Sequence, residues 1–276
     1  MNPLVSVIIP NYNGAPFIAE ALETVFEQRL NNLEVIVIDD GSTDNSMEIL
    51  ERFRSQIKLI STENFGAAAA RNSGMKAARG EFIAFLDSDD LWTKDKLTRQ
   101  LYMLQKLNLD LVYCSSQEFG NEIFSNLIHK AKYEGDCYQY FKRFPTEAII
   151  AQTSGAVIRA SLLRYSGLFD ETFSGASEDW DFFRRYCRYA KVGFCEEILV
   201  YYRRHGDSIT ARSVYEYNSG NRKAVLKMFT EDASIRFIER RLIWAKFNYM
   251  SGRGFLKLWK FRAGIYCLLS IVLPVK

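Results

Sequence analysis

The sequence predicts an α/β fold built on a mostly parallel central sheet. In the first 115 residues, short β-branched or aromatic runs alternate with segments whose apolar residues recur at helical spacing. Repetition of strand, helix and strand at this spacing requires right-handed crossovers, and therefore parallel pairing. Polar clusters follow three of the predicted strands, as expected where loops converge at the carboxyl edge of such a sheet.

Each predicted element of this first part has its own signal. The short runs that form strands are apolar enough to be buried, and the segments between them carry an apolar stripe. In the last helix, Leu97, Leu101 and Leu104 lie one turn apart. The strands are expected at residues 5–9, 34–38, 57–61, 82–86 and 110–114, and the helices at residues 15–28, 44–53, 67–78 and 93–107.

The pattern beyond residue 115 is mixed and then helical. Strands are predicted at residues 153–158 and 198–202. A helix over residues 177–190 begins with Glu178 and Asp179, where the helix dipole favours negative charge. The predicted organisation is one α/β domain over residues 1–212, with halves 1–115 and 116–212, followed by a helical C-terminal extension over residues 213–276.

Composition excludes several classes of protein. The 276 residues are 48% hydrophobic and 25% charged, which is typical of a globular chain and not of a disordered one. Five cysteines without a C-x-x-C pair, together with two histidines, argue against a disulfide framework and against a zinc site. Because no signal peptide and no apolar run of about 18 residues is visible, we expect a cytoplasmic location.

The net charge of +3 hides a gradient along the chain. Residues 1–100 hold 10 Lys/Arg against 15 Asp/Glu (net −5), residues 101–200 hold 11 against 13 (net −2), and residues 201–276 hold 15 against 5 (net +10). A basic end suggests an acidic partner, which could be nucleic acid, an anionic membrane surface or bound phosphates. No recognised nucleic-acid motif accompanies the charge, so we expect no nucleic-acid partner.

An acidic loop follows the fourth predicted strand. Asp87, Ser88, Asp89 and Asp90 come directly after its apolar run. Two carboxylates on one short loop suit Mg²⁺ or Mn²⁺, which proteins often hold through one or two carboxylates while substrate phosphates supply other ligands. Asp also favours surface turns and helix N-termini, and for this motif by itself that alternative stays open.

Two further segments of the first half suit a nucleotide. Asp39 and Asp40 precede Gly41 after the second strand, and capping of the next helix does not need both carboxylates. A carboxylate at this place can accept hydrogen bonds from a base or a ribose. Arg71 lies in the small-residue-rich segment 66–80, which has no dinucleotide fingerprint, and its guanidinium suits a phosphate or a base.

Charged residues also gather in the second half. Glu178, Asp179 and Trp180 open a predicted helix, where carboxylates commonly serve only the helix dipole. Residues 202–208 supply two arginines and His205 near a strand end, which a solvated strand terminus would also explain. Each of these motifs is weak evidence when taken singly.

In this order, however, the motifs resemble the family 2 glycosyltransferases, which are inverting enzymes with the GT-A type nucleotide-diphospho-sugar transferase fold. The resemblance covers roughly residues 4–210 and leaves out the last 65 or so residues. It implies a three-layer α/β/α sandwich with a mostly parallel, mixed sheet and a helical C-terminal extension. The segments that carry the resemblance are 6–14, 37–44, 64–74, 85–92, 167–170, 178–181 and 202–208.

The resemblance also implies a role for each site residue. The donor would be a nucleotide-diphospho-sugar, with a UDP-sugar preferred, and Asp89 would hold Mn²⁺ or Mg²⁺. Asp179 would be the general base for the acceptor hydroxyl. Glu178, Trp180 and Trp92 would shape the acceptor and sugar pocket. The nucleotide and its diphosphate would contact Pro10, Tyr12, Asp40, Arg71, Asp87, Ser88, Arg203, His205 and Ser208.

Function and partners follow from the same resemblance. We expect transfer of one sugar to a saccharide or lipid-linked saccharide in surface polysaccharide, lipopolysaccharide or capsule biosynthesis, because the Q-x-x-R-W motif and the spans of processive synthases are absent. A polyprenyl-phosphate sugar synthase and a non-catalytic nucleotide-sugar-binding partner are the alternatives. Residues 253–276 mix cations with aromatic and aliphatic residues, which suits an anionic membrane surface at the inner face of the cell membrane. Packing of this segment on the domain or in a homodimer is the alternative.

Overall fold

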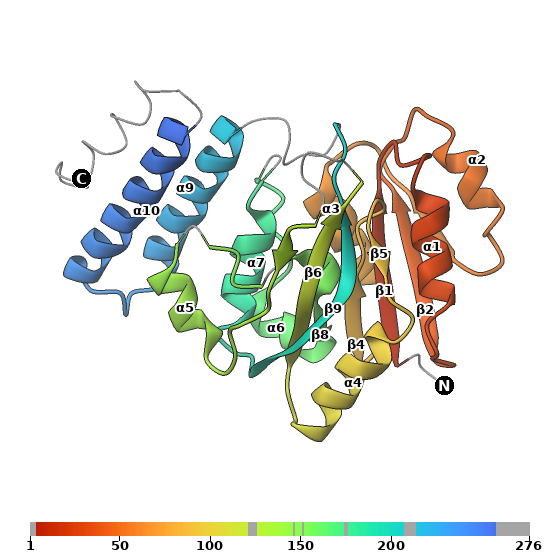
Figure 1. The fold of residues 1–276 in the computed structure, drawn as a ribbon, viewed down its shortest axis with the longest axis horizontal. Coiled ribbons are helices and arrows are strands. Elements are labelled where there is room, and N and C mark those ends of the chain that lie inside the picture. The colour runs from red at the N-terminus through yellow and green to blue at the C-terminus, as the bar shows by residue number, and fades with distance from the viewer. Residues whose placement is uncertain are drawn as a thin grey trace.

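A computed structural model describes residues 4–120, 126–145, 147–150, 152–173, 176–206 and 214–257 (Figure 1). In the first half, strands and helices alternate as the sequence predicts. Its elements are β1 (Val5–Asn11), α1 (Ile18–Phe26), β2 (Leu33–Asp39), α2 (Ser46–Glu51), β3 (Lys58–Ser61), α3 (Ala67–Ala77), β4 (Phe82–Phe85), β5 (Leu91–Trp92), α4 (Lys96–Lys106) and β6 (Leu111–Phe119).

The second half contains shorter elements and then two long helices. Two single 3₁₀ turns, Thr153–Gly155 and Ala160–Leu162, flank one of its strands. Its other elements are β7 (Ile128–His129), α5 (Cys137–Arg143), β8 (Val157–Arg159), α6 (Leu163–Ser166), α7 (Glu178–Tyr186), β9 (Val192–Arg203), α9 (Val214–Glu231) and α10 (Phe237–Lys257).

The strands form one mixed sheet in the order β3-β2-β1-β4-β8-β6-β9-β5, with β7 paired to β6. The strands β3, β2, β1 and β4 pair in parallel, whereas β8 pairs antiparallel with both β4 and β6. The register sets Asn11, the last residue of β1, beside Asp39, the last residue of β2. The loops that follow these two strands therefore begin at the same point of the sheet edge.

Three predictions about elements are wrong in detail. Residues 153–158 were expected to form one strand, but a 3₁₀ turn occupies their first half and β8 begins only at Val157. Residues 57–61 were expected to be buried, but β3 is the edge strand of the sheet and its side chains are partly or fully exposed. The helix predicted over 177–190 ends at Tyr186. Tertiary pairing, which local periodicity does not encode, decides the first two of these outcomes.

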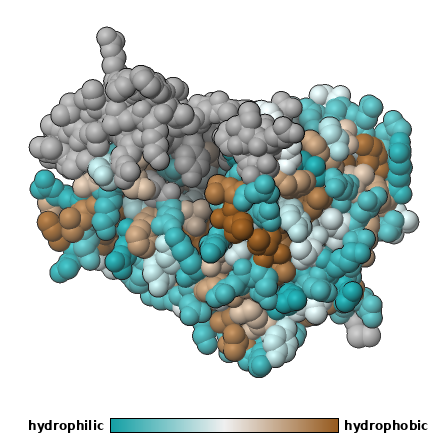
Figure 2. Space-filling model, viewed as in Figure 1, coloured by the Kyte–Doolittle hydropathy of each residue, from teal (hydrophilic) through white to brown (hydrophobic). Residues whose placement is uncertain are grey.

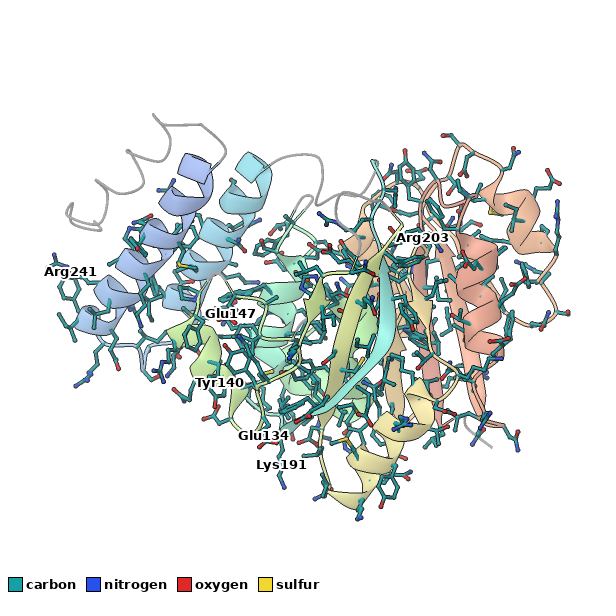
Figure 3. All side chains as sticks on the ribbon, in the orientation of Figure 1. Glu134, Tyr140, Glu147, Lys191, Arg203 and Arg241 are labelled. Carbon is teal, nitrogen blue, oxygen red and sulfur yellow. The ribbon has the colours of Figure 1, made fainter. Side chains whose placement is uncertain are left out.

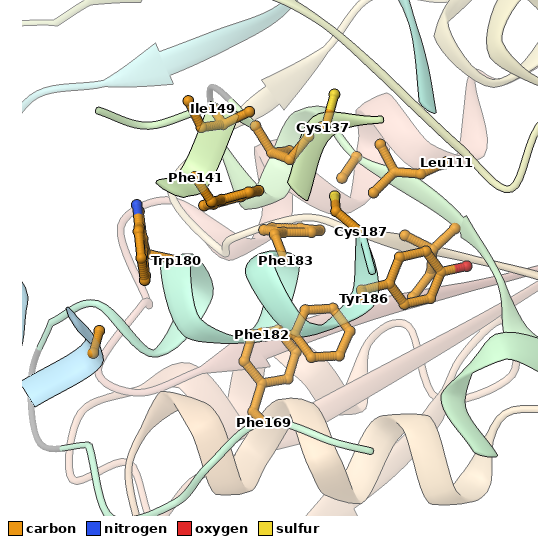
Figure 4. Packing of buried hydrophobic residues seen from close by; sticks show 14 of the residues in the cluster. Leu111, Cys137, Phe141, Ile149, Phe169, Trp180, Phe182, Phe183, Tyr186 and Cys187 are labelled. Carbon is orange, nitrogen blue, oxygen red and sulfur yellow. The ribbon is translucent and has the colours of Figure 1, made fainter. Parts of the chain in front are cut away.

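Two hydrophobic clusters make up the core. One joins α1, α2 and α4 to residues of β1, β2, β4, β6, β8 and β9, and the other joins α3, α5, α7, α9 and α10 to neighbouring residues of the same strands. In the second cluster the rings of Phe169 and Phe182 stack with centroids 4.1 Å apart (Figure 4). Phe85 meets Phe182 edge to face. Successive residues of a strand point to opposite faces, so the two clusters cover the two faces of the sheet and give three layers.

The C-terminal helices α9 and α10 extend this core away from the sheet (Figure 1). Phe237, Ile238 and Leu242 of α10 keep more than half of their surface exposed, and apolar side chains are visible over this part of the helix at the left of Figure 2. No helix within the described ranges is long and apolar enough to cross a membrane. Residues 258–276 of the predicted membrane-contacting segment lie outside the described residues.

Lys96, at the start of α4, is a buried cation with no anionic partner among the described residues. Its side chain is fully buried, and its Nζ has no hydrogen-bond partner in that part of the chain. The Nζ lies 3.9 Å from the centroid of the Trp92 ring, a cation–π contact that offsets part of the lost hydration. Burial nevertheless lowers the pKa of Lys96 to about 8.

We expect Lys96→Met, which keeps an apolar stem and removes the amine, to change how stability depends on pH. The folded-state pKa of about 8 lies below the unfolded value, so the folded wild type binds fewer protons and gains stability as pH rises from about 8 to about 10.4. The difference in unfolding free energy between wild type and variant should therefore shift by about 3 kcal/mol across this range in favour of the wild type. Urea unfolding at a series of pH values measures it, and a constant difference would contradict the burial of an unpaired amine.

Candidate active site

The loops after β1 and β2 interlock at the sheet edge. The Asn11 side chain donates to Asp39 Oδ1 over 2.8 Å, and Ser42 Oγ donates to the same oxygen over 2.6 Å. Gly14 is needed here because a Cβ at this position would lie 2.2 Å from Asn11 Oδ1. These bonds fix the loop that carries Tyr12, whose side chain is 48% exposed and therefore free to meet a planar ligand.

Asp40 is buried and holds the loop that leads into α3. Its carboxylate accepts hydrogen bonds from Thr62 Oγ1 at 2.9 Å, from the Phe65 N–H at 3.1 Å and from the Gly66 N–H at 2.7 Å. The sequence suggested a contact with the nucleotide at this position and gave no sign of this structural task. The bonds place the N-terminus of α3, and with it Arg71, close to the ends of the strands.

Arg71 joins three segments that lie far apart in the sequence. Its guanidinium donates to Asp87 Oδ1 at 2.7 Å and to Glu178 Oε1 at 3.0 Å, and only 6% of its side chain is exposed. Burial works to lower the pKa of Arg71, but the charges of Asp87 and Glu178 outweigh it and raise that pKa above its ordinary value. The guanidinium thus ties α3 to the acidic loop after β4 and to the start of α7.

The acidic loop after β4 is anchored by its last residue. Asp90 is buried; it accepts hydrogen bonds from Ser154 Oγ at 2.6 Å and from the Arg203 N–H at 3.0 Å. Burial, with Asp89 and Asp87 nearby, raises the pKa of Asp90 well above its usual range. Neither Asp90 nor Ser154 was predicted as a site residue. Ser154 lies in the 3₁₀ turn at Thr153–Gly155, and from this turn its hydroxyl reaches Asp90.

The exposed side of this loop faces the end of β9. Asp89 Oδ2 lies 2.9 Å from His205 Nε2, and Ser88 is half-buried beside them. Burial raises the pKa of Asp89, as does the charge of Asp87, while the contact with His205 works in the opposite direction. Burial and the charge of Asp87 therefore outweigh the contact with His205 at this carboxylate.

Arg203 at the end of β9 is held on several sides (Figure 3). Its Nε donates to the Asp89 carbonyl at 2.8 Å, and its guanidinium pairs with Glu20 at 2.5 Å. The guanidinium also lies over the rings of Phe17 and Phe119, at 4.9 and 4.4 Å from their centroids. The structure thus places Arg203 and His205 beside the acidic loop, and their contact with a donor diphosphate stays a prediction. Ser208 lies outside the described residues.

Asp179 sits in the first turn of α7 in a strained local geometry. Ser177, two residues before Asp179, has φ +72°, in the left-handed region that non-glycine residues seldom adopt. Burial raises the pKa of Asp179 to about 6; Glu178 adds to this effect, and Arg71 opposes it. A carboxylate with such a pKa is ionised at neutral pH and still basic enough to take a proton.

A cavity of about 50 Å³ adjoins Asp179. Trp180 forms one wall: its indole donates to the Glu147 carbonyl at 3.2 Å, and its ring meets Phe141 edge to face (Figure 4). Trp92 lies elsewhere, buried under the acidic loop with its indole donating to the Ser154 carbonyl at 2.9 Å. The cavity lining consists of Phe141, Ala148, Ile149, Ile150, Ser177, Asp179, Trp180, Phe183 and Asn221.

The sequence pattern of glycosyl transferase family 2 matches residues 6–166, which is more than half of the chain, and the protein belongs to this family. The membership agrees with the site geometry and confirms both the predicted family and the predicted class of enzyme, a glycosyltransferase. The carboxylates, the arginine and the loops described above are the features on which that prediction was based.

Three similar proteins illustrate the family and its fold. The uncharacterized glycosyltransferase RT0329 of Rickettsia typhi is 33% identical over 217 residues, which cover 76% of this chain and 66% of that protein. WfgD of Escherichia coli, a UDP-Glc:alpha-D-GlcNAc-diphosphoundecaprenol beta-1,3-glucosyltransferase, is 43% identical over 120 residues, which cover 43% of this chain and 47% of WfgD. The chain therefore spans less than two thirds of the length of these two relatives. The crystal structure of Staphylococcus aureus TarS 1-349 in complex with UDP-GlcNAc is similar with a TM-score of 0.74 at 22% identity, covering 98% of this chain and 80% of that one. This similarity confirms the predicted GT-A type fold.

We expect Arg71→Gln to destabilise the protein by about 2–4 kcal/mol, because Asp87 and Glu178 keep their charges and lose their shared buried partner. Arg52→Gln is the matched control, since Arg52 pairs with Glu48 on the surface and both side chains are about two-thirds exposed. Urea unfolding should give a change of less than about 0.5 kcal/mol for this control. Equal effects of the two substitutions would show that Arg71 does not hold the three segments together.

Proposed function

We propose that this protein is an inverting, metal-dependent glycosyltransferase that moves one sugar from a nucleotide-diphospho-sugar to a hydroxyl of a saccharide or lipid-linked saccharide in surface polysaccharide biosynthesis. The observation that carries the proposal is Asp179, a half-buried carboxylate beside a cavity, with its pKa raised to about 6. Arg71 connects it, through Glu178, to the loop that would hold the donor. A UDP-sugar is the proposed donor, because WfgD uses UDP-Glc by name and the TarS structure contains UDP-GlcNAc.

The donor nucleotide would bind at the ends of β1, β2 and β4. The exposed ring of Tyr12 supports stacking on the base, with Pro10 beside it at the end of β1. Asp40 accepts three hydrogen bonds within the protein, and its carboxylate would use its remaining lone pairs to accept a hydrogen bond from the base. Asp87, 31% exposed and held at one oxygen by Arg71, and the neighbouring Ser88 would meet the ribose.

The residues around Asp89 fit a divalent cation bound together with the donor diphosphate. No group of three or more His, Cys, Asp or Glu in the described parts of the chain could hold a metal ion without other ligands. A site of one carboxylate completed by phosphate oxygens is typical of Mg²⁺ and suits Mn²⁺. The half-buried carboxylate of Asp89, with Asp87 two residues before it, supports this, because it supplies negative charge that a cation would balance. When bound, the cation would supply positive charge to the departing diphosphate.

Asp179 would act on the acceptor. A hydroxyl in the adjoining cavity would attack the anomeric carbon, and Asp179 would take its proton as the bond to the donor phosphate breaks. The electron pair of that bond leaves with the nucleoside diphosphate, near the guanidinium of Arg203 and the imidazole of His205. A single displacement of this kind forms no covalent intermediate with the enzyme and inverts the anomeric configuration.

Two partners are proposed for the C-terminal extension, a membrane surface and a second copy of the chain. An anionic membrane surface would suit a lipid-linked acceptor, and the exposed Ile238 and Leu242 of α10 add apolar surface to the region that leads into residues 253–276. A homodimer through the same helices would cover this surface instead.

We expect Asp179→Asn to lower turnover of the donor by at least about 100-fold, because the amide cannot accept the proton. Binding of UDP in the presence of MnCl₂, followed by calorimetry, should be unchanged. Turnover is measured as release of UDP from UDP-glucose and UDP-GlcNAc, with and without a lipid-linked saccharide acceptor. Asp95→Asn is the control and should behave as wild type, because the carboxylate of Asp95 is 46% exposed and lies far from Asp179 in the sequence. Full turnover by Asp179→Asn would remove Asp179 from the role of base and overturn the proposed mechanism.

The turnover rate should fall about tenfold for each pH unit below about 6. Asp179 works in its ionised form, and burial raises its pKa to about 6, so protonation removes the base as pH falls through this value. The charged groups that face it are Glu178 on its own helix, Arg71 on α3 and Asp87 on the loop after β4. Steady-state rates between pH 5 and pH 8 test this, and a rate that stays constant down to pH 5 would contradict it.

A further inference from the structure

Ser177, the residue before Glu178 and the proposed base Asp179, is held in an unfavourable backbone conformation. Ser177 has φ +72° and ψ +9°, and its side chain makes no capping bond to α7. A serine in the left-handed region costs on the order of 1 kcal/mol, so it keeps this conformation only where the surroundings impose it. The conformation decides the direction in which α7 begins, and therefore where the carboxylate of Asp179 points.

The side chain that imposes it comes from α9. Ser177 Oγ donates to Asn221 Oδ1 over 2.8 Å, and both residues are at least 95% buried. Asn221 also lines the cavity next to Asp179. A hydrogen bond between two buried neutral side chains has no water to replace it when one partner is removed.

The backbone of α9 approaches the same residues closely. A Cβ at Gly220 would lie 2.6 Å from the Ala176 carbonyl oxygen and 2.9 Å from Ser177 Oγ, so a larger residue does not fit without a shift. The absent side chain at position 220 is what allows Asn221 to reach Ser177.

Ion pairs hold α9 in register with α7 further along the two helices. Lys227 contacts Asp170 at 2.6 Å and Asp181 at 2.9 Å, and Arg184 contacts Glu231 at 2.5 Å. Asp181 and Arg184 are fully buried. Because charges at this depth tolerate little displacement without loss of their partners, α9 cannot slide along α7.

We propose that Asn221 is a positioning residue for Asp179: through its bond to Ser177 it fixes the strained entry into α7 and so aims the base at the acceptor cavity. The inference rests on the proposed function, since it assigns Asn221 to the same reaction. Asn221 acts through Ser177, whereas Lys227 and Arg184 only secure the helix on which it lies.

Asn221→Ala tests this in the full-length protein. Release of UDP from UDP-glucose and UDP-GlcNAc with MnCl₂ should show kcat reduced on the order of 10–100-fold, with KM for the donor and the affinity for UDP unchanged. Arg222→Ala, at the next position of α9, is the matched control, because Arg222 is exposed and faces Trp244 of α10. It should retain wild-type kcat.

The double variant Ser177→Gly/Asn221→Ala separates positioning from helix packing. Glycine adopts φ +72° without strain, so this variant needs no bond from α9 and should recover most of the lost kcat. Loss of activity that follows the melting temperature and is not rescued by the glycine would overturn the inference, as would Asn221→Ala with wild-type kcat.

These outcomes are distinguishable from failure of the proposed function. If Asp179→Asn abolishes turnover while Asn221→Ala turns over as fast as the wild type, only the positioning role is overturned. Absence of wild-type turnover with every donor and acceptor would overturn the proposed function, and the positioning role with it.

Discussion

The arrangement of the site depends on one buried cation, the guanidinium of Arg71. It contacts Asp87 from the first half of the chain and Glu178 from the second, and Asp179 lies close enough to affect its pKa. Three carboxylates around one cation leave an excess of negative charge in a partly buried region. Burial is the largest cause of the rise in the pKa of Asp179 to about 6, and the charge of Glu178 adds to it against the opposing charge of Arg71.

The same principle explains how the basic residues from 201 onward meet acidic residues earlier in the chain. Arg203 and His205 contact the backbone and side chain of Asp89, and Arg203 also pairs with Glu20. Lys227 of α9 contacts Asp170 and Asp181. Part of the charge gradient along the sequence is therefore used inside the molecule, and the large positive charge of residues 201–276 does not all face outside partners.

Local periodicity and motif order were sufficient to predict the alternating elements of the first half and the family. They were not sufficient for Ser154, Asp90 or Asn221. Ser154 bonds to a carboxylate 64 positions earlier, and Asn221 to a hydroxyl 44 positions earlier. Neither residue stands in a pattern that predicts its partner, because the partner is chosen by how strands and helices pack. Trp92 shows the converse case: a motif predicts nearness to the site, but packing turns its ring into the core.

Strain and charge act together at the start of α7. A helix N-terminus would by itself favour the ionised form of Asp179 and lower its pKa. The opposite shift is found, because burial and the adjacent Glu178 outweigh the dipole and Arg71. Burial of this turn in turn requires that α9 lie against Ala176 and Ser177, a contact that Gly220 permits and Asn221 secures. The basicity of the proposed catalytic carboxylate is therefore a property of the packing between α7 and α9 as much as of the acidic residues themselves.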